Sequence, residues 1–366
     1  MRGIKELPYE LRCFIISLVL QSNLIPKLQQ WKYVELDSSV FSVAFSPKGD
    51  TFLAGKGDKT GELWDWKTKT KLTTFQGHVG PICSVAFVPG GESVVIGSTD
   101  GTARLCSVTT GELIRTFEGC HSSSIRSIAC SPDGKTVLTG SKDTTSSLWS
   151  LQTGKSIEVF KEHTGAIWSV AWKPDGEAFI TGSDDQTARI WDLTTKKVIL
   201  ILVGDKSCVY SVAWSLNGKT VITGHFNGTV CLWDSVTGER LRVFSQPLRV
   251  FSETGFNNSL YQANPLDSVA FSPDGKFIIG GARNGCLFLW CFKTGNLVDG
   301  FGAHTSKVSI AVNVEEQTIM TGGLDRYVNL LYLSPALKRL TVEGKEAAFK
   351  EFIGWYCLLL KKSATL

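Results

Sequence analysis

The sequence lacks the motifs that most often reveal a specific chemistry. None of its ten cysteines forms a C-x-x-C pair, the usual mark of a zinc site or a redox-active disulfide. It contains no nucleophile elbow, no phosphate-binding Gly-Lys-Ser loop and no H-E-x-x-H motif. The formal net charge is +4 and the charged residues are spread along the chain, so no basic tract favours nucleic acid. We therefore expect no metal, no cofactor, no catalytic residues and no nucleic-acid partner.

A hydrophobic run long enough to span a membrane is also missing. The apolar segment from Cys13 to Leu20 is too short to cross a bilayer, Glu6 and Glu10 precede it, and no small-residue cleavage signal follows it. A secretory signal peptide and a membrane contact are therefore not expected. Cysteines such as Cys106 and Cys130 stand where sister copies of an internal repeat carry apolar residues, which favours small buried hydrophobes in a reducing compartment. The sequence thus predicts a cytoplasmic protein.

What the sequence does contain is one short pattern repeated seven times. A phrase close to Ser-Val-Ala-Phe begins at Ser42, Ser84, Ser127, Ser169, Ser211, Ser268 and Ser309. The steps between these serines are 42, 43, 42, 42, 57 and 41 residues. A second anchor follows each serine, at Trp64, Cys106, Trp149, Trp191, Trp233, Trp290 and Leu331. An internal period of about 40–45 residues indicates that each copy is one supersecondary unit.

Each copy has the composition of four short strands. In the fourth copy, the apolar segment 167–172 precedes the Lys-Pro-Asp-Gly turn 173–176, where proline fixes φ and glycine allows a positive φ. Three further strand-like segments, 177–182, 187–193 and 197–203, are separated by two more turns. A four-stranded sheet cannot bury both of its faces alone, so the copies must stack around a common axis.

This pattern resembles the WD-repeat family, whose repeats carry a Gly-His near their start and a Trp-Asp near their end. The second motif occurs at Trp64-Asp65, Trp191-Asp192 and Trp233-Asp234. The resemblance covers about residues 28 to 336 and implies an all-β fold, a seven-bladed β-propeller of four-stranded blades. We expect three parts, which are a short α-helical segment at 1–27, the propeller at 28–336 and a helical tail at 337–366.

The seventh copy clearly shows only three strands, so its fourth strand must come from elsewhere in the chain. Residues 29–34 lie the same distance before Val40 as residues 72–75 lie before Ile82. This spacing favours an N-terminal strand that closes the ring and removes two open sheet edges. Residues 338–342 are the alternative, because they would complete the last blade from its own side of the chain.

The resemblance also implies a structural network of four side chains in each blade. It consists of a His before the first strand, a Ser or Thr in the second, an Asp in the next turn and a Trp in the third. Complete sets are His121, Thr139, Asp143 and Trp149 in blade 3, and His163, Thr181, Asp185 and Trp191 in blade 4. They have the composition of catalytic triads, but their recurrence at one spacing favours mutual satisfaction of buried polar groups. Blades 5 and 6 lack the His, and His225, which replaces a turn serine in blade 5, is expected at the surface.

A partner-binding surface is predicted at the residue before each anchor serine, which opens the first strand near the central channel. Around the ring these residues are Phe41, Cys83, Arg126, Trp168, Tyr210, Asp267 and Val308. Blades 3 to 5 carry arginine, tryptophan and tyrosine there, the residue types that dominate interface energetics. The alternative is that these aromatic residues pack on the next blade. Turn residues of the same face are Lys142, Asp184, Phe226 and Arg283.

The one irregular step, of 57 residues, marks an insertion of about fifteen residues between blades 5 and 6. The segment 245–265 joins these blades on the same face and carries Phe251, Phe256 and Tyr261. Loops of this length are usually functional or disordered. We favour a functional loop that extends the partner-binding surface.

The two chain ends carry apolar segments of their own. Leu7-Pro8-Tyr9-Glu10-Leu11 and the apolar residues that follow resemble the start of an F-box, with proline in the first turn of a helix. This resemblance implies a Skp-type adaptor as a partner of residues 7–20. The alternatives are packing of the helix, a processed leader and a membrane contact. Residues 346–362 are expected to form a second helix with one apolar stripe.

These observations favour a non-enzymatic scaffold or adaptor that binds one or more proteins or peptides through one propeller face. An F-box-like substrate receptor of a cullin-type ubiquitin ligase is the alternative, and it requires residues 7–20 to bind a Skp-type adaptor. An enzyme that uses the central channel is a third hypothesis. It is disfavoured because the repeated His/Asp/Thr sets have a structural explanation.

Overall fold

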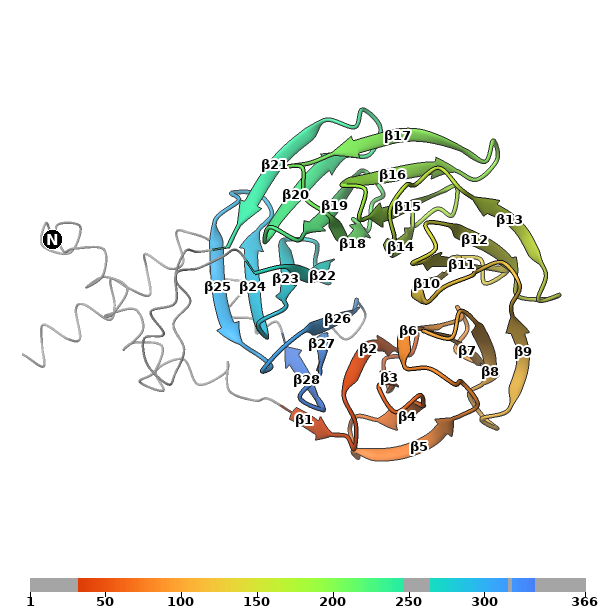
Figure 1. The fold of residues 1–366 in the computed structure, drawn as a ribbon. Coiled ribbons are helices and arrows are strands. Elements are labelled where there is room, and N and C mark those ends of the chain that lie inside the picture. Colours follow the sequence, from red (N-terminus) through yellow and green to blue (C-terminus); the bar gives the residue numbers. More distant parts are fainter. Residues whose placement is uncertain (1–31, 247–263, 315–317, 333–366) are drawn as a thin grey trace, which may run out of the picture. The chain divides into compact units, whose positions relative to one another are not determined.

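The described residues of this computed structural model form a ring of seven four-stranded sheets. The structure describes residues 32–246, 264–314 and 318–332. These residues contain 28 β-strands and no α-helix. Figure 1 shows the sheets, or blades, around a central axis, with the first strand of each blade innermost. The predicted seven-bladed all-β propeller is confirmed, and the helices predicted within 1–27 and 337–366 lie outside the described residues.

Each blade is an antiparallel sheet whose strands follow one another in sequence. Blade 1 has β2 (Val40–Phe45), β3 (Thr51–Lys56), β4 (Gly61–Asp65) and β5 (Thr70–Phe75). Blade 2 has β6 (Ile82–Phe87), β7 (Ser93–Ser98), β8 (Ala103–Ser107) and β9 (Leu113–Phe117). Blade 3 has β10 (Ile125–Cys130), β11 (Thr136–Ser141), β12 (Ser146–Ser150) and β13 (Ser156–Phe160). Blade 4 has β14 (Ile167–Trp172), β15 (Ala178–Ser183), β16 (Thr187–Asp192) and β17 (Lys197–Val203).

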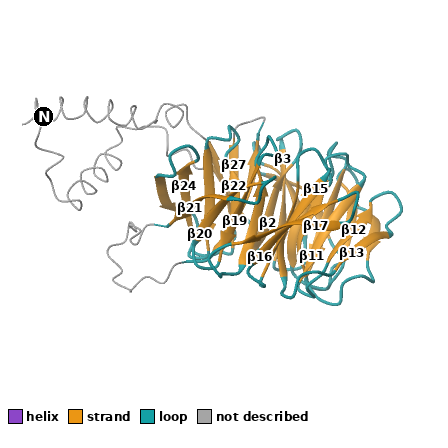
Figure 2. Cartoon of the chain, turned by 90° about the horizontal axis from the view of Figure 1, so that it is seen from above, coloured by secondary structure: helices purple, strands orange, loops and turns teal. Residues whose placement is uncertain are grey.

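The remaining blades follow the same pattern, with one exception at the closure. Blade 5 has β18 (Val209–Trp214), β19 (Thr220–His225), β20 (Thr229–Asp234) and β21 (Arg240–Ser245). Blade 6 has β22 (Leu266–Phe271), β23 (Phe277–Ala282), β24 (Cys286–Cys291) and β25 (Leu297–Gly302). Blade 7 has β26 (Val308–Asn313), β27 (Thr318–Gly323), β28 (Tyr327–Tyr332) and, from the other end of the chain, β1 (Lys32–Glu35). In a view turned by 90°, the connecting loops lie on the two faces of the ring (Figure 2).

The first and last described strands pair with each other and close the ring. β1 runs antiparallel to β28, with Val34 opposite Val328. The prediction of an N-terminal closing strand is therefore confirmed for Lys32–Glu35, and residues 29–31 lie outside the described residues. The alternative segment 338–342 lies outside the described residues. Closure gives β28 a second neighbour, so it does not present an open edge.

The hydrophobic core lies between neighbouring blades. Six clusters of buried apolar side chains each combine residues from two adjacent blades. In one of them Ile222 and Phe244 of blade 5 pack with Leu266 and Trp290 of blade 6. In another, Val34 and Met320 of blade 7 pack with Val43 and Phe52 of blade 1. Each sheet therefore buries its faces against its neighbours, as the repeat pattern requires.

The repeated serine joins each blade to the next. The backbone N–H that follows each anchor serine donates to the hydroxyl oxygen of the anchor serine in the preceding blade. The bonds are Val85 to Ser42 (3.2 Å), Ile128 to Ser84 (3.0 Å), Val170 to Ser127 (3.1 Å), Val212 to Ser169 (3.1 Å), Val269 to Ser211 (2.9 Å), Ile310 to Ser268 (3.2 Å) and Val43 to Ser309 (3.3 Å). The last bond joins blade 1 to blade 7 and completes the circle. The serine hydroxyl of every copy therefore accepts an inter-blade hydrogen bond, which alanine could not do.

A β-bulge precedes that serine in blades 1 to 6. The pairing of the first two strands shifts register at the residue directly before the anchor serine, as between Ile167 and Ser169 in blade 4. The bulged residues are Phe41, Cys83, Arg126, Trp168, Tyr210 and Asp267. A bulge removes its residue from the ladder and redirects the side chain. The six positions predicted from the repeat are thus six equivalent bulges at the inner strands.

Blade 7 departs from this pattern and corrects one predicted position. β26 pairs with β27 without a shift, and Val308 lies directly opposite Gly323. Val308 is fully buried, so it does not line the channel mouth. His304 and Ser309 are five positions apart, whereas His163 and Ser169 are six apart, and the missing residue is the bulge.

Candidate protein-binding site

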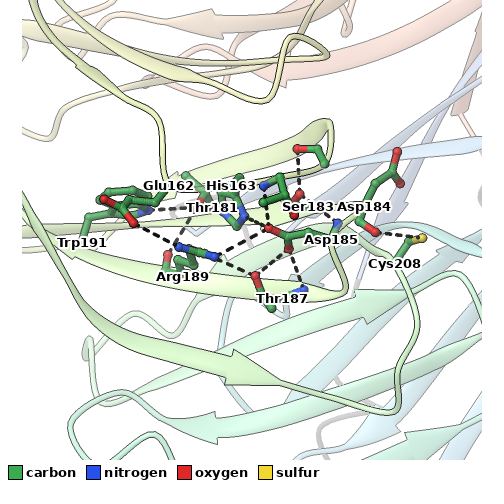
Figure 3. A network of polar contacts seen from close by, with 12 residues as sticks. Glu162, His163, Thr181, Ser183, Asp184, Asp185, Thr187, Arg189, Trp191 and Cys208 are labelled. Atoms are coloured by element: carbon green, nitrogen blue, oxygen red, sulfur yellow. Dashed lines mark hydrogen bonds and ion pairs between the residues drawn. The ribbon is translucent and has the colours of Figure 1, made fainter.

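The predicted four-residue sets form hydrogen-bond chains inside the blades, and Figure 3 shows the set of blade 4. In blade 4, Trp191 Nε1 donates to Thr181 Oγ1 at 2.9 Å, and that hydroxyl donates to His163 Nε2 at 2.7 Å. His163 Nδ1 donates in turn to Asp185 Oδ2 at 2.6 Å. The Asp185 carboxylate also accepts from the backbone and the hydroxyl of Thr187, at 3.0 and 2.6 Å.

Blade 3 repeats this arrangement with its own four residues. Trp149 Nε1 donates to Thr139 Oγ1 at 2.9 Å, Thr139 lies 2.7 Å from His121 Nε2, and His121 Nδ1 lies 3.1 Å from Asp143 Oδ2. The Thr139 and Trp149 side chains are buried. The polar atoms of the set hydrogen-bond to one another within the blade. The set therefore stabilises the turn before β12 and leaves none of its groups free to attack a substrate.

Blade 5 completes its network with a histidine that the sequence analysis placed wrongly. His225 was expected at the surface, but it is 0% exposed at the end of β19. Its Nε2 accepts from Thr223 Oγ1 at 2.8 Å, and Thr223 accepts from Trp233 Nε1 at 2.9 Å. Its Nδ1 donates to the carbonyl oxygen of Ser207 at 3.3 Å. One imidazole therefore replaces both the missing histidine and the turn serine.

The space for this ring comes from a glycine. A Cβ atom on Gly204 would lie 2.6 Å from His225 Cε1, so only glycine admits the imidazole here. In blade 4 the corresponding serine, Ser183, donates to the carbonyl oxygen of Gly165 at 2.9 Å. The bond from His225 to Ser207 occupies the same place, eighteen residues back along the chain in both blades.

Replacing His225 with serine is expected to lower the free energy of unfolding by about 2 kcal/mol at pH 7.5, because the Thr223 hydroxyl loses its acceptor. Burial holds the pKa of His225 below its usual value, and the hydrogen bond to Ser207 opposes this shift. As the pH falls below about 6.5 the unfolded chain takes up the proton first, so the wild type loses stability. Urea denaturation should show the difference between wild type and H225S shrinking from pH 7.5 to 5.5. A difference independent of pH would contradict a buried neutral ring.

The bulged residues of blades 3 to 5 contact one another at one end of the channel. The guanidinium carbon of Arg126 lies 4.9 Å from the centre of the Trp168 ring. Trp168 meets Tyr210 edge to face at 5.2 Å, and Tyr210 meets Phe226 edge to face at 5.7 Å. We call these four residues the aromatic ladder. The predicted alternative, packing on the next blade, also holds in part, because Trp168 of blade 4 contacts Tyr210 of blade 5. Tyr210 contacts Phe226 in the turn after β19 of its own blade.

Blade 6 extends the aromatic ladder with an ion pair. Arg283 lies 5.1 Å from the centre of the Tyr210 ring. Its Nη2 and Nε donate to the two carboxylate oxygens of Asp267, at 2.7 and 3.2 Å. The hydrogen bond to Asp267 raises the pKa of Arg283, and burial raises the pKa of Tyr210. Sequence analysis noted Arg283 and Asp267 separately and missed that they form this pair.

Three other predicted residues are not members of the aromatic ladder. The Phe41 ring packs near Gly57 of blade 1, since a Cβ atom there would lie 3.1 Å from it. Lys142 is exposed in the turn after β11. Asp184 is half-buried in the equivalent turn of blade 4, and its carbonyl oxygen accepts from Cys208 Sγ at 3.5 Å.

The insertion is described only at its two ends. Gln246 Nε2 donates to the carbonyl oxygen of Asn264 at 2.8 Å. A Cβ atom on Gly228 would lie 2.8 Å from that same oxygen, so the base of the insertion contacts the turn that carries Phe226. The predicted residues Phe251, Phe256 and Tyr261 lie outside the described residues.

Comparison with known proteins identifies the repeats. The profile of the family described as "IFT122 first beta-propeller" matches residues 81–259, and that of "WD domain, G-beta repeat" matches residues 32–65 and 258–291. The "66 kDa stress protein" of Physarum polycephalum is 28% identical over 92 residues, which are 25% of this chain and 15% of that relative. The chain thus matches only a small part of that relative's length. WD-repeat propellers are generally non-catalytic and typical of protein-interaction scaffolds. Seven four-stranded blades and the two matching profiles show that the chain carries WD repeats folded as a β-propeller.

Proposed function

We propose that this protein is a non-enzymatic scaffold or adaptor that binds a protein or peptide at the channel mouth of blades 3 to 5. The observation that carries the proposal is the aromatic ladder, Arg126, Trp168, Tyr210 and Phe226. Tryptophan, tyrosine and arginine account for most hot spots of protein interfaces. Here the three types adjoin one another without being buried in the core.

The side chains of the aromatic ladder are held in place before binding, but part of their surface remains exposed. Bulges direct Arg126, Trp168 and Tyr210 out of the sheet, and ring contacts hold the four side chains of the ladder in place, which lowers the entropy lost on binding. Phe226 remains 46% exposed. The indole Nε1 of Trp168 has no hydrogen-bond partner among the described residues. An apolar side chain of a partner would pack on the exposed Phe226 ring.

The insertion supports the same surface. Asn264, at the described end of the insertion, contacts the turn that carries Phe226. Phe251, Phe256 and Tyr261 stay predicted contributors to partner binding. Phe41, Lys142 and Asp184 are proposed as peripheral contacts, with Asp184 the nearest to the ladder because its charge contributes to the raised pKa of Tyr210.

The Trp168→Ala variant tests this function. Full-length wild type and variant are used to capture partners from a eukaryotic lysate, followed by quantitative mass spectrometry. A hot-spot residue contributes about 2 kcal/mol or more to binding, so we expect specific partners to fall at least tenfold. Thermal unfolding should change by no more than about 1 kcal/mol, whereas loss of a core tryptophan costs about 3–5 kcal/mol. Val236→Ala, at an 81% exposed side chain, is the matched control. Unchanged capture, or a collapse in stability, would overturn the proposal.

The F-box-like alternative and the location of the protein stay predictions. Residues 7–20 lie outside the described residues, so nothing in the described propeller favours a Skp-type adaptor. In the described part of the chain, no helix has the length and hydrophobicity needed to traverse a bilayer. The eight described cysteines are all free thiols, which supports the predicted cytoplasmic location.

A further inference from the structure

The outermost strand of blade 4 presents an aliphatic edge that no other described strand covers. β17 is the last strand of its sheet, at the outer rim of the ring (Figure 1), and with seven residues it is the longest described strand. Residues 198–203 are six consecutive aliphatic side chains. Ile199, Ile201 and Val203 form an exposed row on one face of the sheet, while Leu202 packs in the core between blades 4 and 5. Alternate residues of an edge strand also direct their N–H and C=O groups away from the sheet.

The other outer strands carry a protection that β17 lacks. An exposed edge invites pairing with another chain, and proteins commonly interrupt such an edge with a charged side chain. The outer strands β5, β9, β13, β21 and β25 each have a charged residue inside the strand, which is Lys71, Arg115, Glu158, Arg242 and Asp299 in turn. The single charge of β17, Lys197, stands at its first residue. The rest of β17 is therefore open to pairing with another strand.

The sequence of β17 is complementary to itself when two copies run antiparallel. About a two-fold axis at Ile201, Ile199 of one copy lies opposite Val203 of the other, and Leu200 lies opposite Leu202. The exposed aliphatic row then meets its own copy on one face of the joined sheet, where side chains directly opposite each other pack together. Because a two-fold contact is isologous, it closes at two copies and leaves no edge of β17 for a third.

Opposite charges meet at both ends of this pairing. In the register centred on Ile201, Lys197 lies opposite Asp205 of the second copy, and both residues are exposed. An in-register parallel arrangement would instead bring Lys197 against its own copy, and like charges directly opposite each other destabilise a sheet. The charge pattern therefore selects the antiparallel arrangement.

Neighbours within the same copy offset part of these charges. Asp205 forms an ion pair with Arg240 of blade 5. Asp192 lies opposite Lys197 in the pairing of β16 with β17. The attraction between the two ends is therefore modest, and the aliphatic row supplies most of the contact.

Two further lysines flank β17 and would repel each other if they continued the joined sheet. Lys196 and Lys206 have positive φ values of 58° and 50°, so the backbone turns out of the strand at both residues. Lys196 also forms an ion pair with Glu158 of blade 3 at 2.6 Å. Neither lysine therefore extends the pairing of the two strands.

From this edge we infer that the protein forms a two-fold dimer in which β17 pairs antiparallel with β17 of a second copy. The two blades then form one continuous antiparallel sheet, in which the outward N–H and C=O groups find partners and the aliphatic row leaves water. The aromatic ladder lies at the inner strands of the ring, so the dimer keeps both channel mouths open. This inference is independent of the proposed function, and it makes the assembly bivalent for a partner that binds at the channel mouth.

Sedimentation equilibrium of the full-length chain between about 1 and 100 µM tests the inference. We expect the weight-average mass to rise with concentration towards twice that of one chain. Ile201→Lys places inside β17 the kind of charge that the other outer strands carry, and it should weaken association at least tenfold. Leu241→Lys, on the outer strand of blade 5, is the matched control, because Leu241 is 47% exposed and Ile201 is 53% exposed. This control should associate like the wild type, and thermal unfolding of the two variants should agree.

A charge exchange tests the register. Lys197→Asp and Asp205→Lys should each weaken association about fivefold at about 50 mM salt, since like charges then meet at both ends. The double variant K197D/D205K restores opposite charges and should recover most of the wild-type association. A double variant that is weaker than either single variant would overturn the proposed register.

Three outcomes would overturn the dimer itself. They are a mass equal to one chain at every concentration, association that I201K leaves unchanged, and a mass that grows past two copies. Loss of another captured protein in I201K, with a wild type that stays monomeric, would also overturn it, because β17 would then pair with a different strand. Trp168→Ala should leave the dimer intact, so the dimer and the proposed channel-mouth site can fail separately.

Discussion

Asp185→Ala is expected to lower the free energy of unfolding by about 3–5 kcal/mol, one of the largest effects of any single substitution in the propeller. The carboxylate accepts from four groups, which are His163 Nδ1, the backbone N–H of Thr164, and the backbone and hydroxyl of Thr187. Alanine leaves the buried His163, the partly buried Thr187 groups and the exposed Thr164 amide without this acceptor. The total stability of a domain is only about 5–15 kcal/mol, so this loss brings the propeller near unfolding.

The effect of this variant should depend on pH in a defined direction. Burial alone would raise the pKa of Asp185, but the hydrogen bonds from His163 and Thr187 dominate and hold it below its usual value. A carboxyl group with a lowered pKa contributes its stability fully above the unfolded pKa of about 4, and loses it as the pH falls through the folded value. The difference between wild type and D185A should therefore be constant from pH 5 to 7 and shrink below about pH 4.

The neighbouring acid provides a matched control. Asp184 adjoins Asp185 in the chain, but its hydrogen bonds involve only its backbone, whose N–H donates to the Ala166 carbonyl at 2.9 Å and whose carbonyl accepts from Cys208 Sγ at 3.5 Å. Asp184→Ala should change the free energy of unfolding by no more than about 0.5 kcal/mol. Urea denaturation of both variants measures the two effects side by side. Equal effects would mean that the network in blade 4 contributes little, and the structural role assigned to the four-residue sets would be wrong.

The sequence predicted the ring and its complete blades because their signals are periodic. Seven serines in register specify seven equivalent positions, and the structure shows that each serine makes the same inter-blade bond. The sets of blades 3 and 4 were found because all four residues stand at the same spacing. Periodicity therefore carries both the architecture and the interactions that repeat with it.

Periodicity did not reveal residues that replace a missing member of the blade network from another position in the repeat. His225 reaches the site of a missing histidine from the end of a strand, and the only sequence signal is the glycine that makes room, Gly204. Val308 was predicted to be equivalent to the bulged residues because it directly precedes the anchor serine. The interval from His304 to Ser309 is one residue shorter than in blade 4, which indicates that blade 7 lacks the bulge. Pairing of Arg283 with Asp267 depends on two turns meeting in space, which no spacing within one repeat reveals.

Blade 1 holds the most unusual of these substitutions, a buried lysine. Of the expected four-residue set, blade 1 contains only Asp58 and Trp64. In the structure, Lys56 is 1% exposed and its Nζ donates to Asp37, to Asp58 at 2.8 Å and to Glu62 at 3.0 Å. Burial alone would lower the pKa of Lys56, but these hydrogen bonds raise it above its usual value. The lysine is therefore charged at neutral pH.

This ion cluster connects the closing strand to blade 1. Trp64 Nε1 donates to Glu62 Oε2 at 3.0 Å, so the glutamate takes the part that threonine has in blade 4. Asp37 belongs to the segment between β1 and β2, which crosses from blade 7 to blade 1. Ser39 Oγ and the backbone N–H of Leu36 attach this segment to Leu324 and Arg326 of blade 7, at 3.0 and 2.9 Å. Lys56 thus holds the chain at the point where the ring is closed.

Lys56→Met is expected to cost about 3–5 kcal/mol, because it removes the charge and leaves the buried Glu62 carboxylate poorly compensated. The double variant K56M/E62Q should recover at least half of this loss, since the amide oxygen still accepts from Trp64 and no buried charge remains. Lys71→Met is the control, because Lys71 pairs with the same carboxylate at 3.1 Å but is 44% exposed. An exposed pair of this kind contributes at most about 1 kcal/mol.

Hydrogen exchange of the K56M variant shows which strands lose protection. If the ion cluster holds the closure, K56M should accelerate exchange at the amides of β1 and β28, such as Val34 and Val328, more than at those of blade 4. Closure joins the two ends of the described propeller, so opening it exposes strand edges on both sides. Uniform acceleration across all blades would show that Lys56 contributes only to global stability. Protection retained at β1 with a loss of stability below 1 kcal/mol would show that Glu62 is satisfied by Lys71 and Trp64 alone.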